Sequence, residues 1–408
     1  RKAAMCIGDE AFPLLEKTGI ILSDKMGATG DLVTRTWKSV LDMRPGHPKA
    51  MKVLKELYSL NRDWDALESL FAERENWIGY IETLEECARQ TDDPAEKVHL
   101  FFRIADVFTL RLNKPERAVK SYESVLEVDS GNVRAAEHLL PLYEESGRWK
   151  DAARMLELQA AAAAPEEKHA LLLRLVEVTG EKLQQPDHAF NWCAQAYLLD
   201  PRNASVLERL EQLAEKSGKW RELADLYAAV ANRFEGGEKI RHLARLAHLT
   251  VDRLADLDRG EEIWRSVLAM DDQYGEALLG LASIYELRGE WAQLLDILNR
   301  QITSAPRMED RLAAMMKMGQ VMESRMERPT EAIEMYKRVM AQEPSYLPAM
   351  EALDRLYEAG RMYENLAHIL RQEEKLCDGQ KRIGIRLRLG RLFLELSDPQ
   401  EALSCFES

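Results

Sequence analysis

Glycine and proline are scarce in this chain of 408 residues. It contains 21 Gly and 14 Pro, together about 9%, against an average near 12%. A protein built from β-strands needs many turns that use these two residues, so their scarcity favours helices. The sequence also lacks any apolar run of about 18 residues, which excludes a transmembrane helix and predicts that the chain does not insert into a membrane.

Cysteine is sparse too, and its distribution excludes a disulfide framework. The five residues are odd in number, far apart and without a C-x-x-C pair, which favours a reducing compartment and hence the cytoplasm. A periplasmic location stays open because the chain begins at Arg1 rather than at Met. Histidines and cysteines nowhere gather into the four-ligand sets that zinc requires, so we expect no metal and no cofactor.

Basic residues are outnumbered, with 56 Lys and Arg against 70 Asp and Glu, and the net charge is −14. This balance disfavours direct contact with nucleic acid, which needs a basic surface. Catalytic signatures are missing as well: there is no Gly-rich phosphate loop, no G-x-S-x-G and no H-E-x-x-H. We therefore expect a protein that is not an enzyme and whose partners are proteins or peptides. The oligomeric state is not determined by these features.

What the sequence does have is an internal repeat of about 71 residues. Four copies of one motif follow each other at steps of 71, 71 and 72, at Trp149, Trp220, Trp291 and Tyr363. A second set, mostly aromatic, keeps nearly the same period, and a small residue precedes each member by four positions. Its members are Tyr122, Cys193, Trp264, Tyr336 and Phe406.

Each period holds four amphipathic stretches joined by short links, which predicts an all-α fold of antiparallel helical hairpins. A glycine lies two or three residues before each copy of the motif, where a helix should end in a conformation with positive φ. These glycines are Gly147, Gly218, Gly289 and Gly360.

Asn132–Gln159 resembles a tetratricopeptide repeat. Seven of its residues fall on the family's pattern positions: Ala136, Leu139, Tyr143, Gly147, Trp149, Ala152 and Leu156. The resemblance extends over about residues 30–408. It implies a right-handed superhelical α-solenoid of stacked antiparallel hairpins, in which a concave groove lined by first helices binds a peptide or helix of a partner protein.

The expected organisation is a single solenoid over residues 1–408 with three irregular parts. Residues 1–29 fit the repeat poorly and are expected to form an irregular helical region. Residues 64–76 are interpreted as an insertion in the first unit, because Trp64 repeats a motif that the period places at Trp77. The last repeat breaks off inside a helix, so we expect a fragment of a larger protein or assembly. A composition rich in Ala, Leu, Arg and Glu favours a bacterial origin.

Two columns of charged residues share the period and are the candidate partner-binding residues. The basic column lies in apolar surroundings on the predicted first helices and comprises Arg103, Arg174, Arg245, Lys317 and Arg388. The acidic column comprises Glu144, Glu215, Glu286 and Glu358. Arginine suits a groove that binds carboxylates, because its planar head donates two parallel hydrogen bonds.

These columns have two interpretations. Arg103 and Glu144, 41 residues apart, would lie on adjacent first helices and could belong to an internal ladder of ion pairs, although the estimated axial offset of about 9 Å is long for direct contact. Alternatively, both columns face a ligand.

The function likewise has alternatives to the interaction scaffold. One is an RNA-processing scaffold of the half-a-TPR type. The other is a regulatory sensor domain of a larger enzyme or transcription regulator.

Overall fold

The computed structural model describes residues 11–25 and 30–407, and it divides into two compact units, Arg1–Val206 and Leu207–Ser408. Every regular element in the described ranges is helical, which confirms the all-α prediction. Unit 1 contains α1 (Ala11–Ile20), α2 (Asp31–Met43), α3 (Pro48–Leu60), α4 (Trp64–Ala72), α5 (Trp77–Gln90), α6 (Pro94–Asp106), α7 (Pro115–Val128), α8 (Val133–Glu145), α9 (Trp149–Ala162), α10 (Pro165–Glu177) and α11 (Pro186–Leu199). Helix α12 (Ala204–Ser217) spans the division.

Unit 2 continues with α13 (Trp220–Ala231), α14 (Gly236–Asp252), α15 (Leu257–Met270), α16 (Gly275–Arg288), α17 (Trp291–Ser304), α18 (Met308–Ser324), α19 (Pro329–Gln342), α20 (Leu347–Ala359), α21 (Tyr363–Leu376), α22 (Gly379–Glu395) and α23 (Pro399–Glu407). None of the helices in the described ranges is both long and apolar enough to cross a bilayer.

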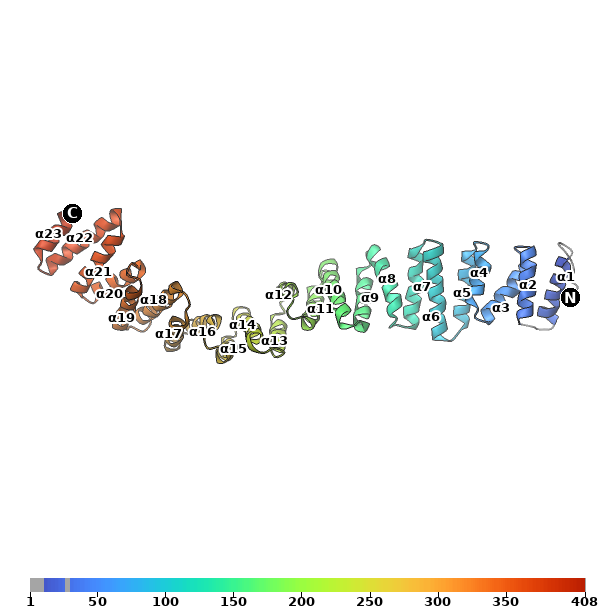
Figure 1. The fold of residues 1–408 in the computed structure, drawn as a ribbon, viewed down its shortest axis with the longest axis horizontal. Coiled ribbons are helices and arrows are strands. Elements are labelled where there is room, and N and C mark those ends of the chain that lie inside the picture. The colour runs from blue at the N-terminus through green and yellow to red at the C-terminus, as the bar shows by residue number, and fades with distance from the viewer. Residues whose placement is uncertain (1–10, 26–29, 408) are drawn as a thin grey trace. The chain divides into compact units, whose positions relative to one another are not determined.

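From α1 to α11 in unit 1 and from α13 to α23 in unit 2, each helix packs against the next as an antiparallel neighbour, and each unit is an α-solenoid (Figure 1). We call the even-numbered helices from α4 onward first helices, and the odd-numbered helices that follow them second helices. One hairpin cannot bury its apolar face alone, so within a unit each hairpin packs on the next. Short links hold this order, as at Asn132, whose side chain accepts a hydrogen bond from the amide of Ala135 at 3.0 Å and begins α8.

The second periodic set forms the core between neighbouring hairpins. Tyr122, Cys193, Trp264 and Tyr336 are at most 2% exposed, and the small residue four positions earlier is buried in each case. Phe406, in the last helix, is 47% exposed. The regular spacing of this set therefore reflects burial in the core at four of its five positions.

Two first helices of unit 1 continue into π-helical turns, η4 (Val107–Arg111) after α6 and η5 (Val178–Lys182) after α10. Each π-turn is followed by a link with one residue at positive φ, Asn113 at 49° and Gln184 at 54°. A π-turn adds one residue to the helical turn, which accommodates a link that is a residue longer than in the tetratricopeptide pattern.

The prediction that a glycine with positive φ ends the helix is correct at three of the four positions. Gly147, Gly218 and Gly289 have φ of 70°, 71° and 71°, but Gly360 has φ of −80° and the next residue, Arg361, takes φ of 55°. The prediction for Gly360 is wrong because the fourth copy is a residue longer: a step of 72 from Gly289 reaches Arg361. A residue with a Cβ therefore occupies the left-handed position that glycine fills in the other copies.

Replacing Arg361 by glycine is expected to stabilise unit 2. A non-glycine residue in the left-handed region costs about 1–2 kcal/mol, and glycine returns about 0.5–1 kcal/mol of that through its greater freedom in the unfolded chain. Thermal and chemical denaturation should show a gain of up to about 1 kcal/mol. Gly218→Ala, the reverse change at an equivalent position, should lower stability, and a loss for Arg361→Gly would contradict the assignment.

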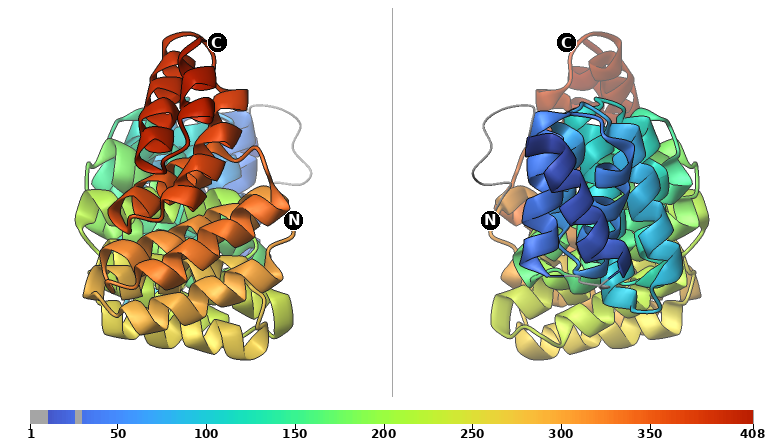
Figure 2. Two further views of the ribbon diagram at one scale, coloured as in Figure 1. Left: turned by 90° about the vertical axis from the view of Figure 1, so that its left-hand side faces the viewer. Right: turned by 90° about the vertical axis from the view of Figure 1, so that its right-hand side faces the viewer.

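Both the N-terminal region, which we expected to be irregular and helical, and the predicted insertion at residues 64–76 contain helix where they are described. In residues 1–29, α1 is followed by a π-helical turn, η3 (Ile21–Lys25), while residues 1–10 and 26–29 lie outside the described ranges. Helix α1 packs against α2, as the blue helices in the right-hand view of Figure 2 show. Residues 64–76 form the short first helix α4 and the turn before α5, which begins at Trp77. The interpretation of this segment as an insertion stays a prediction.

Candidate functional site: the first-helix face

The structure places both charged columns on first helices. Every member of the basic column lies nine residues after the start of its helix, on α6, α10, α14, α18 or α22. Every member of the acidic column lies eleven residues after the start of α8, α12, α16 or α20. The basic position and the acidic position are two residues apart, which is roughly 200° around a helix. A basic residue therefore faces the first helix that precedes its own, and an acidic residue faces the first helix that follows.

Three ion pairs join the columns. Arg174 contacts Glu144 at 2.6 Å, Lys317 contacts Glu286 at 2.7 Å, and Arg388 contacts Glu358 at 2.9 Å. Each basic residue faces the preceding first helix, and its partner lies 30 or 31 residues earlier in the chain. The expected pairing over 41 residues, as between Arg103 and Glu144, is wrong in register because the two positions point to opposite sides of their helices.

Arg103 has different acidic partners because α4 is short. It contacts Asp65 and also Glu68, the latter at 3.2 Å. Helix α4 ends at Ala72, before the position at which the later first helices carry their glutamate. The hydrogen bond from Arg103 lowers the pKa of Asp65. Burial, followed by the charge of Arg103, lowers the pKa of His99, whose ring nitrogen lies 3.1 Å from the guanidinium.

Arg245 is the exception in the basic column. Its side chain is exposed, and it forms no ion pair within the described residues. The glutamate that the register would supply, Glu215, instead contacts Arg253 at 3.6 Å. The ladder of ion pairs is therefore interrupted between α12 and α14.

Arg388 is held more firmly than the other members. It donates two hydrogen bonds to Asp354, at 2.7 and 2.8 Å, in addition to its contact with Glu358. The side chain of Asp354 is only 12% exposed. The hydrogen bond to Asp354 raises the pKa of Arg388, which stays charged.

Replacing Arg174 and replacing Arg388 should therefore have unequal effects on the stability of the protein. Arg174→Ala breaks a pair exposed by 47% and 29%, which is expected to cost about 0–1 kcal/mol. Arg388→Ala leaves the buried Asp354 without its donors and should cost about 1–3 kcal/mol. Denaturation of the two variants tests this order. Equal losses would contradict the assigned difference in burial.

A third periodic set was not found from the sequence. Four basic residues lie over the rings of half-buried tryptophans at 4.7–5.4 Å from ring centroid: Arg111 over Trp77, Lys182 over Trp149, Arg253 over Trp220 and Arg325 over Trp291. The basic residues step by 71, 71 and 72, so the period could have revealed them. These contacts cover the tryptophans with cations and join the end of each first helix to the preceding hairpin.

A groove of about 750 Å³ lies between the first helices α16 and α18 and the end of α17. Glu286 and Lys317, one rung of the ladder, contribute to its lining. The rest is mostly apolar and includes Leu278, Leu279 and Leu298. Leu279 is 65% exposed, and so presents a large apolar side chain to solvent. This volume is in the range of known ligand pockets.

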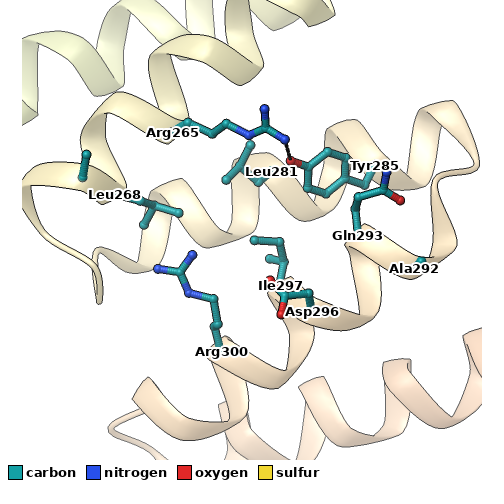
Figure 3. Close-up of a pocket in the computed structure, with 10 residues that line it drawn as sticks. Arg265, Leu268, Leu281, Tyr285, Ala292, Gln293, Asp296, Ile297 and Arg300 are labelled. Atoms are coloured by element: carbon teal, nitrogen blue, oxygen red, sulfur yellow. Dashed lines mark hydrogen bonds between the residues drawn. The ribbon is translucent and has the colours of Figure 1, made fainter.

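A second cavity, of about 590 Å³, lies among α15, α16 and α17 (Figure 3). Its two arginines are already engaged: Arg265 donates to the hydroxyl of Tyr285 at 3.1 Å, and Arg300 donates to the backbone carbonyl of Asp272 at 3.0 Å. Because the chain itself satisfies these cations, the groove at α16–α18 is the stronger candidate for binding. No group of three or more His, Cys, Asp or Glu in the described ranges is arranged to hold a metal ion.

Comparisons with known proteins agree with the hairpin architecture. Models described as tetratricopeptide repeat match residues 110–168, 277–312 and 313–346. The last two segments contain Leu279, Glu286 and Lys317, and so most of the α16–α18 groove. No curated protein matches the sequence.

Several solved structures are similar to this chain. YrrB, described as a TPR protein with an unusual peptide-binding site, is 13% identical, over 45% of this chain and 90% of that one, with a TM-score of 0.32. A tetratricopeptide repeat protein from Parabacteroides merdae is 17% identical, over 67% and 99%, with a TM-score of 0.28. MamA from Desulfovibrio magneticus is 14% identical, over 42% and 94%, with a TM-score of 0.30.

Proposed function

We propose that this chain, which carries tetratricopeptide repeats at residues 110–168 and 277–346, is a non-enzymatic scaffold that binds a segment of a partner protein on its first-helix face. The observation that carries the proposal is the coincidence of three features on the first helices of unit 2. These features are the ion pair between Lys317 and Glu286 of the charged columns, the unpaired cation Arg245 and the apolar groove between α16 and α18. Exposed ion pairs add little stability, so stability alone is a weak reason for the columns.

The charge of this face favours a protein segment over RNA. The basic column is largely neutralised by its own glutamates. A second acidic position, four residues after the start of α8, α12 and α20, carries Glu137, Glu208 and Glu351, all exposed. These carboxylates would repel the phosphates of RNA, whose binding needs an excess of accessible cations.

The test is capture of the partner by the full chain, compared with a double variant of the basic column. Arg174→Ala with Arg245→Ala should reduce the recovered partner several-fold while the Tm falls by no more than a few degrees, because exposed pairs contribute about 0–1 kcal/mol. A matched control, Gln293→Ala with Asp296→Ala, changes exposed residues of the second helix α17 and should leave capture unchanged. A large loss of Tm with unchanged capture would assign the column to stability and overturn the proposal.

A further inference from the structure

The α16–α18 groove departs from the repeat at the residue that makes it apolar. Four residues after the helix start, α8, α12 and α20 carry Glu137, Glu208 and Glu351, whereas α16 carries Leu279. Glu351 forms an ion pair with Lys381, and the two charged atoms lie 2.8 Å apart. At the equivalent positions of the groove, Leu279 stands beside α18, where Asp310 occupies the place of Lys381. At this position the chain presents an exposed leucine in place of a glutamate, and the carboxylate of Asp310 lines the same groove.

Exposing a leucine where the other copies place a charge does not favour the isolated fold. Burial of a leucine side chain is favourable because it removes apolar surface from water, yet Leu279 is 65% exposed. Departures from local consistency of this kind are expected at functional positions. Leu279, Ser283 and Glu286 follow one another at helical spacing, so they form one continuous stripe along the groove.

The groove also contains a polar atom that the chain leaves without a partner. The Nε2 amide of Gln301, at the end of α17, is buried and makes no hydrogen bond. A buried donor without an acceptor is costly, and it is satisfied when the Gln301 side chain turns toward the groove and donates to a carbonyl of a bound segment. The amide therefore indicates an occupant that brings a hydrogen-bond acceptor, such as a peptide backbone, alongside its apolar side chain.

The charge of the groove indicates which residues of the bound segment should flank its apolar side chain. Lys317 is neutralised by Glu286 at 2.7 Å, whereas Asp310 is exposed and forms no ion pair within the described part of the chain. Beyond the paired Glu286 and Lys317, the lining therefore carries one charge, the carboxylate of Asp310, beside an apolar floor, and it complements a single cation of a bound segment.

We propose that the α16–α18 groove binds an aliphatic side chain of a partner segment, flanked by lysine or arginine. The aliphatic group packs on Leu278, Leu279 and Leu298, a backbone carbonyl accepts from Gln301, and the flanking cation pairs with Asp310. This inference rests on the proposed function and adds to it the chemistry of the partner.

The test uses a synthetic peptide and the full chain. The probe is an acetylated and amidated ten-residue peptide in which two leucines alternate with lysines in a glycine–serine background. Two matched peptides carry alanine in place of leucine or glutamate in place of lysine. Binding is measured by fluorescence anisotropy, and its place by the methyl NMR signals of Leu279. We expect the leucine–lysine peptide to bind at least about tenfold more tightly than either matched peptide, a difference of about 1.4 kcal/mol.

The decisive variant introduces into the groove the ion pair that joins α20 and α22. Leu279→Glu with Asp310→Lys reproduces the pair Glu351–Lys381, so the chain should fold with an unchanged or higher Tm and lose at least tenfold in affinity. Glu351→Gln, which breaks the ion pair between α20 and α22, is the control and should leave the affinity within twofold. Gln301→Met keeps the volume and removes the donor, and it should weaken binding several-fold without lowering the Tm.

Unchanged affinity in the double variant, or equal binding of the lysine and glutamate peptides, would overturn the inference. Such a failure is distinguishable from failure of the proposed function. If the captured partner depends on Arg174 and Arg245 while the probe is indifferent to Leu279, the first-helix face binds the partner but this groove is not its specificity pocket. If capture ignores Arg174 and Arg245, the proposed function fails.

Discussion

Replacing Trp264 by alanine is expected to lower the free energy of unfolding of unit 2 by about 3–5 kcal/mol, the usual cost of removing a large aromatic side chain from a core. Trp264 is 1% exposed, lies on the second helix α15, and packs edge-on against His248 with ring centroids 5.0 Å apart. Because each hairpin contacts only its neighbours, hydrogen-exchange protection should fall first in α14, α15 and α16.

The matched control for this variant is Trp291→Ala. Trp291 is half-buried at the start of α17, where Arg325 lies over its ring at 5.4 Å. Trp291→Ala should lower the free energy of unfolding less than Trp264→Ala does, because less of the Trp291 ring is buried in packed surroundings. If Trp264→Ala costs less than Trp291→Ala in chemical denaturation, the assignment of the second periodic set to the core between hairpins is wrong.

Replacing Gly280 by alanine should be destabilising by about 1–3 kcal/mol, although alanine is normally the better helix former. A Cβ at Gly280 would lie 2.3 Å from Nε1 of Trp264, closer than any real contact. Gly275→Ala, in the same helix α16, meets nothing within 4 Å and should be neutral or slightly stabilising. Denaturation of both variants separates the steric effect from helix propensity.

The two changes should also be strongly coupled. In a chain that already carries Trp264→Ala, the clash partner of Gly280→Ala is gone, so the second change should become neutral or stabilising. The double-mutant cycle is expected to yield a coupling energy of about 1–3 kcal/mol. Additive losses would show that Gly280 is not there to admit the indole ring.

The sequence predicted the hairpins well because their causes are local. Apolar residues at helical spacing, glycine at helix ends and a constant period are all visible in the chain, and they specified the all-α solenoid. What failed was register. The pairing of Arg103 with Glu144 assumed equal hairpins, whereas successive first helices orient the two columns to opposite sides, and Arg174 meets Glu144 instead.

The candidate groove could have been recognised only in part. That Leu279 replaces a glutamate of the repeat is visible in the sequence once the register is known. The sequence does not reveal that the amide of Gln301 is buried or that Arg245 is unpaired. Both depend on which side chains of neighbouring hairpins reach each other in three dimensions. Departures from a repeat are informative when the surrounding contacts show that nothing in the chain compensates for them.

The most direct test of the proposed function is hydroxyl-radical footprinting of the full chain with its captured partner. We expect protection on the first helices of unit 2, at Leu279 and Lys317 of the α16–α18 groove and at Arg245 of α14. Protection confined to second helices, as at Gln293 of α17, with the first-helix residues as reactive as in the free chain, would contradict it.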